Sequence, residues 1–149
     1  MPTLVDPLIP DPFPREKADV VVIGGGIIGV SAALTLAERG ISVTLCEKGE
    51  IGAEQSSRNW GWCRQQGRDP REIPLVMKSL ERWAAMNERV QGEVGFKRCG
   101  TLYLADSDQG LEAHGKWLEY AESFGIDTGL ISAAEVAKHL PGSSRTWHG

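Results

Sequence analysis

The chain has 149 residues, of which 41% are hydrophobic and 24% are charged, and its formal net charge is −4. This composition is that of a globular domain with a hydrophobic core. The acidic balance excludes the basic face that a nucleic-acid-binding protein needs. No apolar run approaches the roughly 18 residues of a membrane-spanning helix, so we expect no transmembrane segment.

The cysteines and histidines are few and widely spaced. Cys46, Cys63 and Cys99 form no CxxC motif and leave one thiol without a possible disulfide partner. This usage argues against a disulfide framework and favours a reducing compartment, here the cytoplasm. The histidines pair with no cysteine or carboxylate at the spacing of zinc ligands, and we therefore predict no metal site.

Residues 1–17 form a proline-rich leader, MPTLVDPLIPDPFPREK. The leader lacks the early positive charge and the uninterrupted apolar core of a secretory signal. Its prolines at positions 7, 10, 12 and 14 fix φ and remove backbone donors, which predicts an extended segment. Such a segment can pack on the surface, stay disordered or bind a partner.

A strand, a helix and a second strand are expected after the leader. Residues 19–23 (DVVVI) are typical of a buried strand in a parallel sheet. Residues 30–40 are rich in helix formers and end at Gly40, a residue type that favours the left-handed position after a helix. Residues 41–47 (ISVTLCE) alternate like a strand, with Cys46 facing the core. Together these segments predict one βαβ unit.

Three glycines and one acidic residue of this unit have the spacing of a dinucleotide-binding site. Gly24, Gly26 and Gly29 form GxGxxG between the predicted strand and helix, where they permit a tight turn, close approach of a pyrophosphate and close helix packing. The helix N-terminus offers N–H groups to a diphosphate. Glu47 can accept hydrogen bonds from ribose hydroxyls and would repel a 2′-phosphate. The pattern predicts NAD or FAD, against the alternative of a plain glycine turn beside a surface glutamate.

The rest of the chain departs from a simple doubly wound domain. Residues 48–71 show no periodicity, and a stretch of that length inside a compact domain is usually functional. We then expect a helix over 71–90, a strand over 99–105 and a helix over 106–124. Ser132-Ala-Ala-Glu135 has the form of a capping box and predicts a short final helix.

A plain NAD domain continues with a third strand soon after the second, whereas residues 48–71 suit a segment that runs beneath a cofactor. Here the sequence resembles the D-amino-acid oxidase type of FAD-dependent oxidoreductase, which includes glycine and sarcosine oxidases and bacterial D-amino-acid dehydrogenases. The resemblance covers residues 17–149. It rests on DVVVIGGGIIGVSAALTLAERGISVTLCEKG, GAEQSSRN and RCGTLYLADSDQGLEAHGKWLEYAESFGIDTGLISAAEVAKHLPG.

The resemblance implies an α/β fold, in which a Rossmann-like FAD-binding βαβ unit is followed by the beginning of an α+β substrate domain. Relative to the family this arrangement is incomplete. We expect three regions: the leader at 1–17, the FAD-binding unit with its flavin-lining loop at 18–71, and a helical segment with the start of the substrate-domain sheet and helices at 72–149.

The same resemblance assigns roles to individual residues. Residues 56–58 would run along the pyrophosphate, and Asn59 and Trp60 would approach the flavin ring. Arg64 would pair with a substrate carboxylate, which a planar guanidinium can hold in bidentate fashion. The expected cofactor-binding set is Gly24, Gly26, Ile27, Ile28, Gly29, Glu47, Lys48, Ser56, Ser57, Arg58, Asn59 and Trp60.

Several residues near this loop have a structural alternative. Trp60 and Trp62 suit either the two sides of a half-buried extended segment or contact with the flavin. Cys63 is either a small core residue or a reactive or flavin-linked thiol. Arg58 and Arg68 suit solvated positions as well as ligand contacts.

The reaction implied by the resemblance is oxidation of the C–N bond of an amino acid or N-alkyl amino acid by hydride transfer to flavin. The substrate would be a small amino acid or amine. Because members of the family are longer, we expect a complementing C-terminal polypeptide or a homo-oligomer. Two alternatives stay open: an NAD-dependent Rossmann dehydrogenase, and a non-catalytic truncated or split subunit that needs a partner chain.

Overall fold

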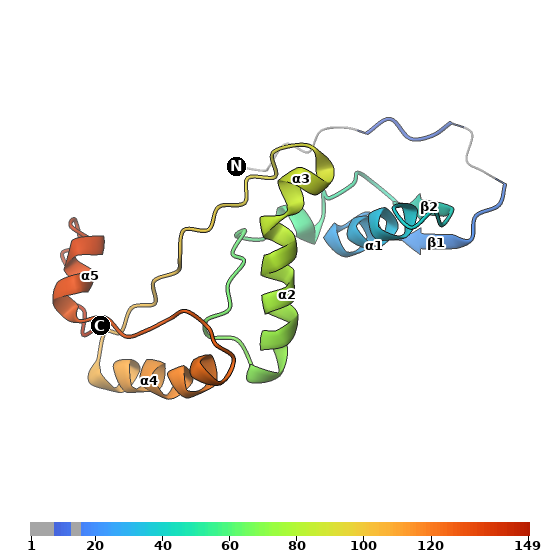
Figure 1. The fold of residues 1–149 in the computed structure, drawn as a ribbon. Coiled ribbons are helices and arrows are strands. Elements are labelled where there is room, and N and C mark those ends of the chain that lie inside the picture. Colours follow the sequence, from blue (N-terminus) through green and yellow to red (C-terminus); the bar gives the residue numbers. More distant parts are fainter. Residues whose placement is uncertain (1–7, 13–15) are drawn as a thin grey trace. The chain divides into compact units, whose positions relative to one another are not determined.

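The computed structural model describes residues 8–12 and 16–149. The chain divides into two compact units, Met1–Trp62 and Cys63–Gly149, which are coloured in sequence order in Figure 1. The predicted leader lies partly outside the described residues. Within its described part, Leu8 and Ile9 are exposed.

The first unit is built on a βαβ arrangement. β1 (Val20–Ile23) and β2 (Val43–Cys46) pair in parallel, with Val20 opposite Val43 and Ile23 opposite Cys46. α1 (Ile27–Ala37) connects the two strands and lies against them (Figure 1). The β-branched run of β1 favours a strand, and the expected βαβ unit is confirmed.

Two glycines make the connections of this unit possible. Gly24 has a φ of 106°, and its N–H donates to the Cys46 carbonyl at 2.8 Å, which extends the ladder by one residue past β1. Gly40 has a φ of 77° after α1, where the N–H of Ile41 donates back to the Leu36 carbonyl at 3.1 Å. Residues with a Cβ rarely adopt such positive φ values.

The expected burial of the strands is wrong for part of the sheet. Val21 is 58% exposed and Ile23 is 88% exposed. Cys46, expected in the core, is exposed as well. The reason is that α1 covers one face of β1 and β2, and the described residues of this unit place no further element against the other face. Side chains along β1 therefore alternate between exposed and half-buried, whereas burial on both faces of the strand was expected.

The second unit begins with a helix that is interrupted. A short 3₁₀ turn, η2 (Pro70–Glu72), leads into α2 (Ile73–Ala84) and α3 (Met86–Val90). The single helix expected over 71–90 is thus broken at Ala85, whose ψ of 3° lies outside the helical range. Ile73 is fully buried.

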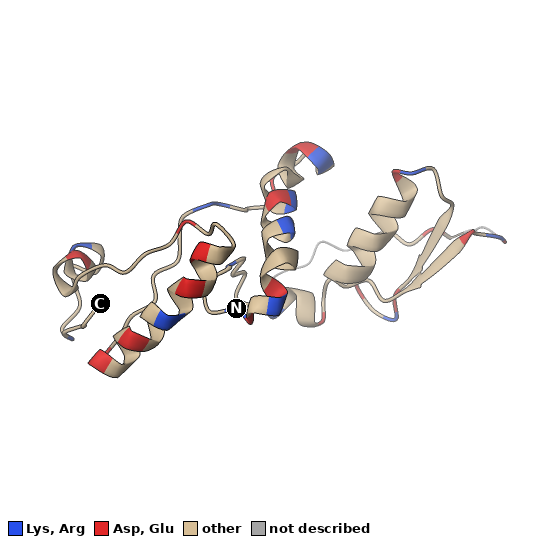
Figure 2. Ribbon diagram, turned by 60° about the horizontal axis from the view of Figure 1, so that its bottom comes forward, with Lys and Arg blue, Asp and Glu red and all other residues tan. Residues whose placement is uncertain are grey.

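The two later helices match the sequence expectations. α4 (Asp108–Ser123) begins after Ser107, whose hydroxyl accepts from the Gly110 N–H. α5 (Ala133–His139) begins at the predicted capping box, in which Ser132 and Glu135 each cap the other's backbone. Acidic side chains predominate along α4 (Figure 2). The buried apolar residues of the unit are Ile73, Ala105, Ala121 and Val136.

The strand expected over 99–105 is not formed. The segment has no regular secondary structure, and within the described part of the chain its backbone pairs only at Ala105. There the Ala105 N–H donates to the Gly149 carbonyl at 2.8 Å, and the His148 N–H donates to the Ala105 carbonyl at 2.9 Å. A strand needs backbone hydrogen bonds to a neighbouring strand along its length. These two hydrogen bonds involve one residue of the segment, Ala105, so no strand forms.

Candidate functional site

The N-terminus of α1 is the focus of the first unit. Gly26 is the N-cap residue, with a φ of −75° and a ψ of 177°. The hydroxyl of Ser56, from the short turn η1 (Gln55–Ser57), accepts a hydrogen bond from the Ile27 N–H at 2.8 Å. A helix N-terminus carries free N–H groups and a partial positive charge. It is therefore suited to an anionic diphosphate.

Two glycines at this end have no room for a side chain. A Cβ on Gly29 would lie 1.9 Å from the Gly24 carbonyl oxygen, far inside contact distance. A Cβ on Gly26 would lie 3.1 Å from the Ser56 hydroxyl. Gly29 lets α1 approach the turn after β1, and Gly26 lets the Ser56 hydroxyl reach the N-terminus of α1.

Glu47 follows β2 and turns its carboxylate toward the glycine turn. Its Oε2 accepts from the Gly25 N–H at 2.7 Å, and its Oε1 accepts from the Gly49 N–H at 2.9 Å. These hydrogen bonds, the one from Gly25 first, lower the pKa of the carboxyl, so the group is charged at neutral pH. A carboxylate has about four lone-pair positions. Two are used here, which leaves acceptor capacity for hydroxyl groups.

The lowered pKa of Glu47 leads to a prediction on acid stability. A group whose pKa is depressed by folding stabilises the fold above its ordinary pKa, and that contribution is lost as the pH falls through the folded-state pKa. We expect unfolding of the first unit, followed by amide hydrogen exchange in β1 and α1, to show this loss below about pH 4.5. The variant Glu47→Gln should show a flatter acid limb, and an identical limb would contradict the assignment.

Gly25 is a site residue that the sequence reasoning missed. Besides its bond to Glu47, its carbonyl accepts from the Gly52 N–H at 2.9 Å. A Cβ on Gly25 would lie 2.3 Å from the Ile51 Cδ1 atom. The signal in the sequence was the unbroken run Gly24-Gly25-Gly26, which has one glycine more than GxGxxG requires.

The two basic residues of the expected cofactor-binding set, Lys48 and Arg58, lie on the surface. Lys48 Nζ is 3.3 Å from Glu54 Oε1, and Arg58 Nη2 is 3.7 Å from Glu54 Oε2. All three side chains are exposed, so these ion pairs contribute little to stability. Ser57 donates its hydroxyl to the Ala53 carbonyl at 3.0 Å.

The loop then presents two tryptophans to solvent. Trp60 is 84% exposed and Trp62 is 62% exposed. Their ring centroids lie 5.8 Å apart in an edge-to-face arrangement. Neither ring is buried in the first unit, so the half-buried extended segment is excluded there. Trp62 stands outside the set expected to bind the cofactor.

Arg64 belongs to the second unit, where it contacts an aromatic ring. Its guanidinium carbon lies 5.6 Å from the centroid of Tyr103, and its Nη1 donates to the Gln66 carbonyl. The Tyr103 hydroxyl donates to the same carbonyl at 3.2 Å. Tyr103 thus holds the Arg64 loop, a role that the sequence did not show because 39 residues separate the pair.

Cys63 and Arg68 lie close to Arg64 in the sequence. Cys63 is exposed, so the alternative of a small core residue is wrong. Desolvation raises the pKa of its thiol, which disfavours the thiolate that a reactive cysteine needs. Arg68 Nη1 lies 3.6 Å from Glu72 Oε2, while its Nε is buried without a hydrogen-bond partner. The Arg68 carbonyl accepts from the Trp117 Nε1–H at 3.2 Å. Arg68 is therefore tied to its own unit by its backbone and its side chain.

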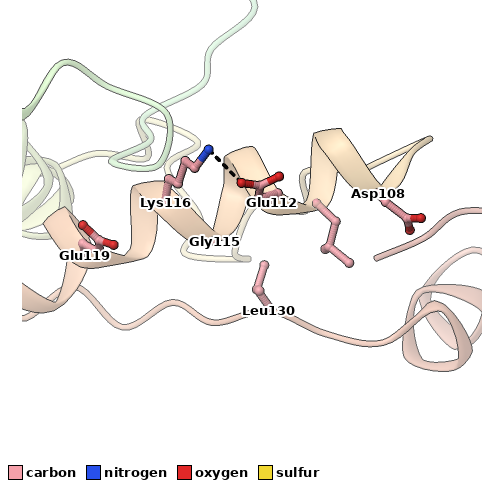
Figure 3. A pocket seen from close by; sticks show the side chains of 7 residues that line it. Asp108, Glu112, Gly115, Lys116, Glu119 and Leu130 are labelled. Atoms are coloured by element: carbon pink, nitrogen blue, oxygen red, sulfur yellow. Dashed lines mark ion pairs between the residues drawn. The ribbon is translucent and has the colours of Figure 1, made fainter.

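α4 carries an open hollow of about 500 Å³ on its surface (Figure 3). The ion pair between Lys116 and Glu112, 2.8 Å long, lies on its rim. No residue of the expected site lines it. Its lining residues are Asp108, Leu111, Glu112, Gly115, Lys116, Glu119 and Leu130.

The first unit therefore holds all of the expected cofactor residues, and the second unit holds Arg64. In the part of the chain that the structure describes, no three side chains of the His, Cys, Asp or Glu type are grouped to hold a metal ion. In that same part, no helix is long and apolar enough to cross a membrane.

Comparison with known proteins identifies the family. The family described as FAD dependent oxidoreductase matches residues 19–149, and the chain belongs to this family. The resemblance on which FAD was expected is thereby confirmed.

Individual relatives show what this chain is similar to. It is 30% identical over 132 residues to sarcosine oxidase subunit beta of Rhizobium meliloti (strain 1021), covering 87% of this chain and 32% of the relative. It is 27% identical over 151 residues to glycine oxidase of Geobacillus kaustophilus (strain HTA426), covering 87% and 40%. L-amino acid deaminase from Proteus vulgaris superposes with a TM-score of 0.82 at 31% identity, covering 97% and 34%.

The chain thus spans about a third of the length of the relatives it matches. The family is FAD-dependent, so FAD takes the place of the NAD alternative. In the first unit the charged Glu47 lies beside the glycine turn, and the Ser56 hydroxyl lies beside Gly26 at the N-terminus of α1. The expected βαβ unit is present, whereas the second unit is helical and forms none of the expected substrate-domain sheet.

Proposed function

We propose that this chain forms the FAD-binding part of an oxidoreductase that oxidises the C–N bond of an amino acid or N-alkyl amino acid. The observation that carries the proposal is the contact between the Glu47 carboxylate and the Gly25 N–H, 2.7 Å long, beside the N-terminus of α1. The names of the relatives support the substrate class, because sarcosine oxidase, glycine oxidase and L-amino acid deaminase all act on amino acids or their N-alkyl derivatives.

The residues around the N-terminus of α1 have binding roles in this proposal. The N–H groups of Ile28 and Gly29, in the first turn of α1, would donate to the diphosphate. Glu47 would accept from the ribose hydroxyls with the acceptor positions that Gly25 and Gly49 leave unused. Residues 56–58 would line the diphosphate on the other side, since Ser56 already reaches the Ile27 N–H.

The chemistry needs few groups from the protein. When bound, FAD supplies a two-electron acceptor for the hydride that leaves the carbon next to nitrogen. Arg64 would hold the substrate carboxylate, and Tyr103 would position Arg64 through the ring contact and through Gln66. The guanidinium suits this role because its planar fork matches a carboxylate.

We further propose that activity requires a complementing polypeptide or a second copy of the chain. The support is the name of one relative, sarcosine oxidase subunit beta, which describes a subunit. The decisive test mixes the purified chain, with any polypeptide that copurifies, with sarcosine, glycine or a larger amino acid without oxygen. Bleaching of the flavin absorption by one of these amines supports the proposal. A bound flavin that none of them bleaches would favour a non-catalytic subunit.

Replacing Arg64 by lysine tests the carboxylate role. We expect the KM for carboxylated amines to rise roughly tenfold, the effect of exchanging a bidentate for a single charge-assisted hydrogen bond. FAD occupancy, read from the ratio of flavin to protein absorption, should not change. Arg98→Lys, a change at an exposed position of the same unit, is the matched control. An unaltered KM in Arg64→Lys would remove Arg64 from the substrate site.

A further inference from the structure

The turn that follows Arg64 is tied to the rest of the second unit at both ends. At its far end, the indole Nε1–H of Trp117, a residue of α4, donates to the Arg68 carbonyl at 3.2 Å. At its near end, Arg64 Nη1 and the Tyr103 hydroxyl both donate to the Gln66 carbonyl. All of these residues belong to the second unit. The guanidinium of Arg64 is thus bonded to a turn that α4 holds.

This turn, residues 65–68, is a single stiff piece of backbone. The Arg68 N–H donates to the Gln65 carbonyl at 3.3 Å, which closes the turn. Gly67 inside it has a φ of 67°, a conformation that residues with a Cβ rarely adopt. A Cβ on Gly67 would lie 3.4 Å from Arg64 Nη1 and 3.5 Å from the Tyr103 ring. A displacement of the turn at Arg68 would therefore also move the groups that contact the guanidinium.

One face of α4 makes these contacts. His114, Trp117 and Ala121 follow one another at helical spacing. Ala121 is buried, and the His114 ring lies edge-to-face against Tyr103, with ring centroids 6.1 Å apart. Arg64 itself lies in a segment without regular secondary structure. Side chains on a helix are placed more precisely than those on a loop, so α4 can fix what the Arg64 segment alone would leave loose.

We propose that Trp117 is a positioning residue for the substrate carboxylate. Its indole N–H holds the 65–68 turn, and the turn holds the guanidinium of Arg64. The inference rests on the proposed function, in which Arg64 binds the carboxylate. It adds α4 to the substrate site through the Arg68 carbonyl, without contact between Trp117 and the substrate.

The test measures the affinity for a carboxylate in Trp117→Phe, which keeps an aromatic ring and removes the N–H donor. The chain, with any polypeptide that copurifies, is assayed with the amino acid that bleaches its flavin. Acetate serves as a competitive inhibitor that has a carboxylate but no amine. We expect the KM and the inhibition constant of acetate to rise together, roughly three- to tenfold, the effect of losing one hydrogen bond. FAD affinity should not change.

The double variant Trp117→Phe with Arg64→Lys shows whether Trp117 acts through Arg64. If it does, adding Trp117→Phe to Arg64→Lys should change the KM by less than about twofold, because the guanidinium that the turn positions is already absent. If the two single effects multiplied in full, Trp117 would act elsewhere and the inference would be overturned.

Trp147→Phe is the matched control. Trp147 is half-buried like Trp117, and its Nε1–H donates to the Ser143 hydroxyl at 3.1 Å in the same unit. The variant loses an equivalent hydrogen bond, yet it should leave the KM and the acetate constant unchanged. Gly67→Ala changes the same turn without altering α4, and its strained φ should raise both constants. It carries the test if Trp117→Phe does not fold.

Unchanged constants in Trp117→Phe, or in Gly67→Ala where the first variant does not fold, would overturn the inference while the proposed function stands. A higher KM without a higher acetate constant would overturn it as well, because the effect would then lie outside the carboxylate. A flavin that no amino acid bleaches would refute the proposed function, and the inference with it.

Discussion

Gly29→Ala is expected to destabilise the first unit by about 3 kcal/mol, at the upper end of what overpacking costs, and to abolish FAD binding. The added Cβ would lie 1.9 Å from the Gly24 carbonyl oxygen, a backbone atom that cannot move aside as the end of a flexible side chain could. The start of α1 would have to shift away from the turn after β1. That shift displaces the N–H groups on which the cofactor site depends. Chemical denaturation and FAD titration measure the two effects.

Gly115→Ala is the matched control for this change. Gly115 also lies within a helix, α4, but its added Cβ would be 3.8 Å from Leu130, an ordinary contact distance. Because alanine favours a helix over glycine, we expect Gly115→Ala to stabilise the second unit by roughly 0.5–1 kcal/mol. If Gly29→Ala were as harmless as Gly115→Ala, α1 would not need its close approach to the turn.

Glu47→Ala is expected to weaken FAD binding roughly ten- to a hundredfold, the range for losing hydrogen bonds to a charged group. The variant also removes the acceptor of the Gly25 N–H and so loosens the glycine turn. ADP binding should fall by the same factor as FAD binding, because Glu47 serves the ribose of the half that the two ligands share. Titration of both ligands measures the effect.

Glu50→Ala controls for the loss of one negative charge in the same loop, since Glu50 is exposed. It should leave the affinity for both ligands within about twofold of the unaltered chain, as expected for a surface charge. Unchanged FAD affinity in Glu47→Ala would remove the carboxylate from the ribose. A loss for FAD without a loss for ADP would place Glu47 near the flavin ring instead.

The sequence was informative where a rule acts over a few residues. The positive φ of Gly24 and the lack of space at Gly29 follow from local geometry, which is why GxGxxG predicts the turn. The capping box at Ser132 is equally local, and it was predicted correctly. These features need no knowledge of what packs against them.

Features that depend on distant segments escaped prediction. The exposure of Ile23 and Cys46 depends on whether a second layer covers the sheet, which the residues of a strand do not reveal. The segment 99–105 has the composition of a strand but lacks a ladder on which to pair. In the same way, the contact between Arg64 and Tyr103 joins residues far apart in the chain.

The role of Trp60 and Trp62 could be predicted only in part from the sequence. Their sequence left packing and flavin contact equally open, because alternating large side chains suit either. The structure decides the first part of the question: both rings are exposed in the first unit. Contact with the flavin stays a prediction; the hydrogen bonds of the loop from Ser56 to Gly61 hold that loop to the N-terminus of α1.

The central claim is that the first unit binds FAD through its ADP half. The most direct measurement titrates the 149-residue chain, together with any polypeptide that copurifies, with FAD, and then displaces the flavin with ADP. We predict a flavin absorption band that stays with the protein after removal of free ligand, and full displacement by ADP. A chain that retains no flavin but binds NAD, or one whose flavin ADP does not displace, would contradict the claim.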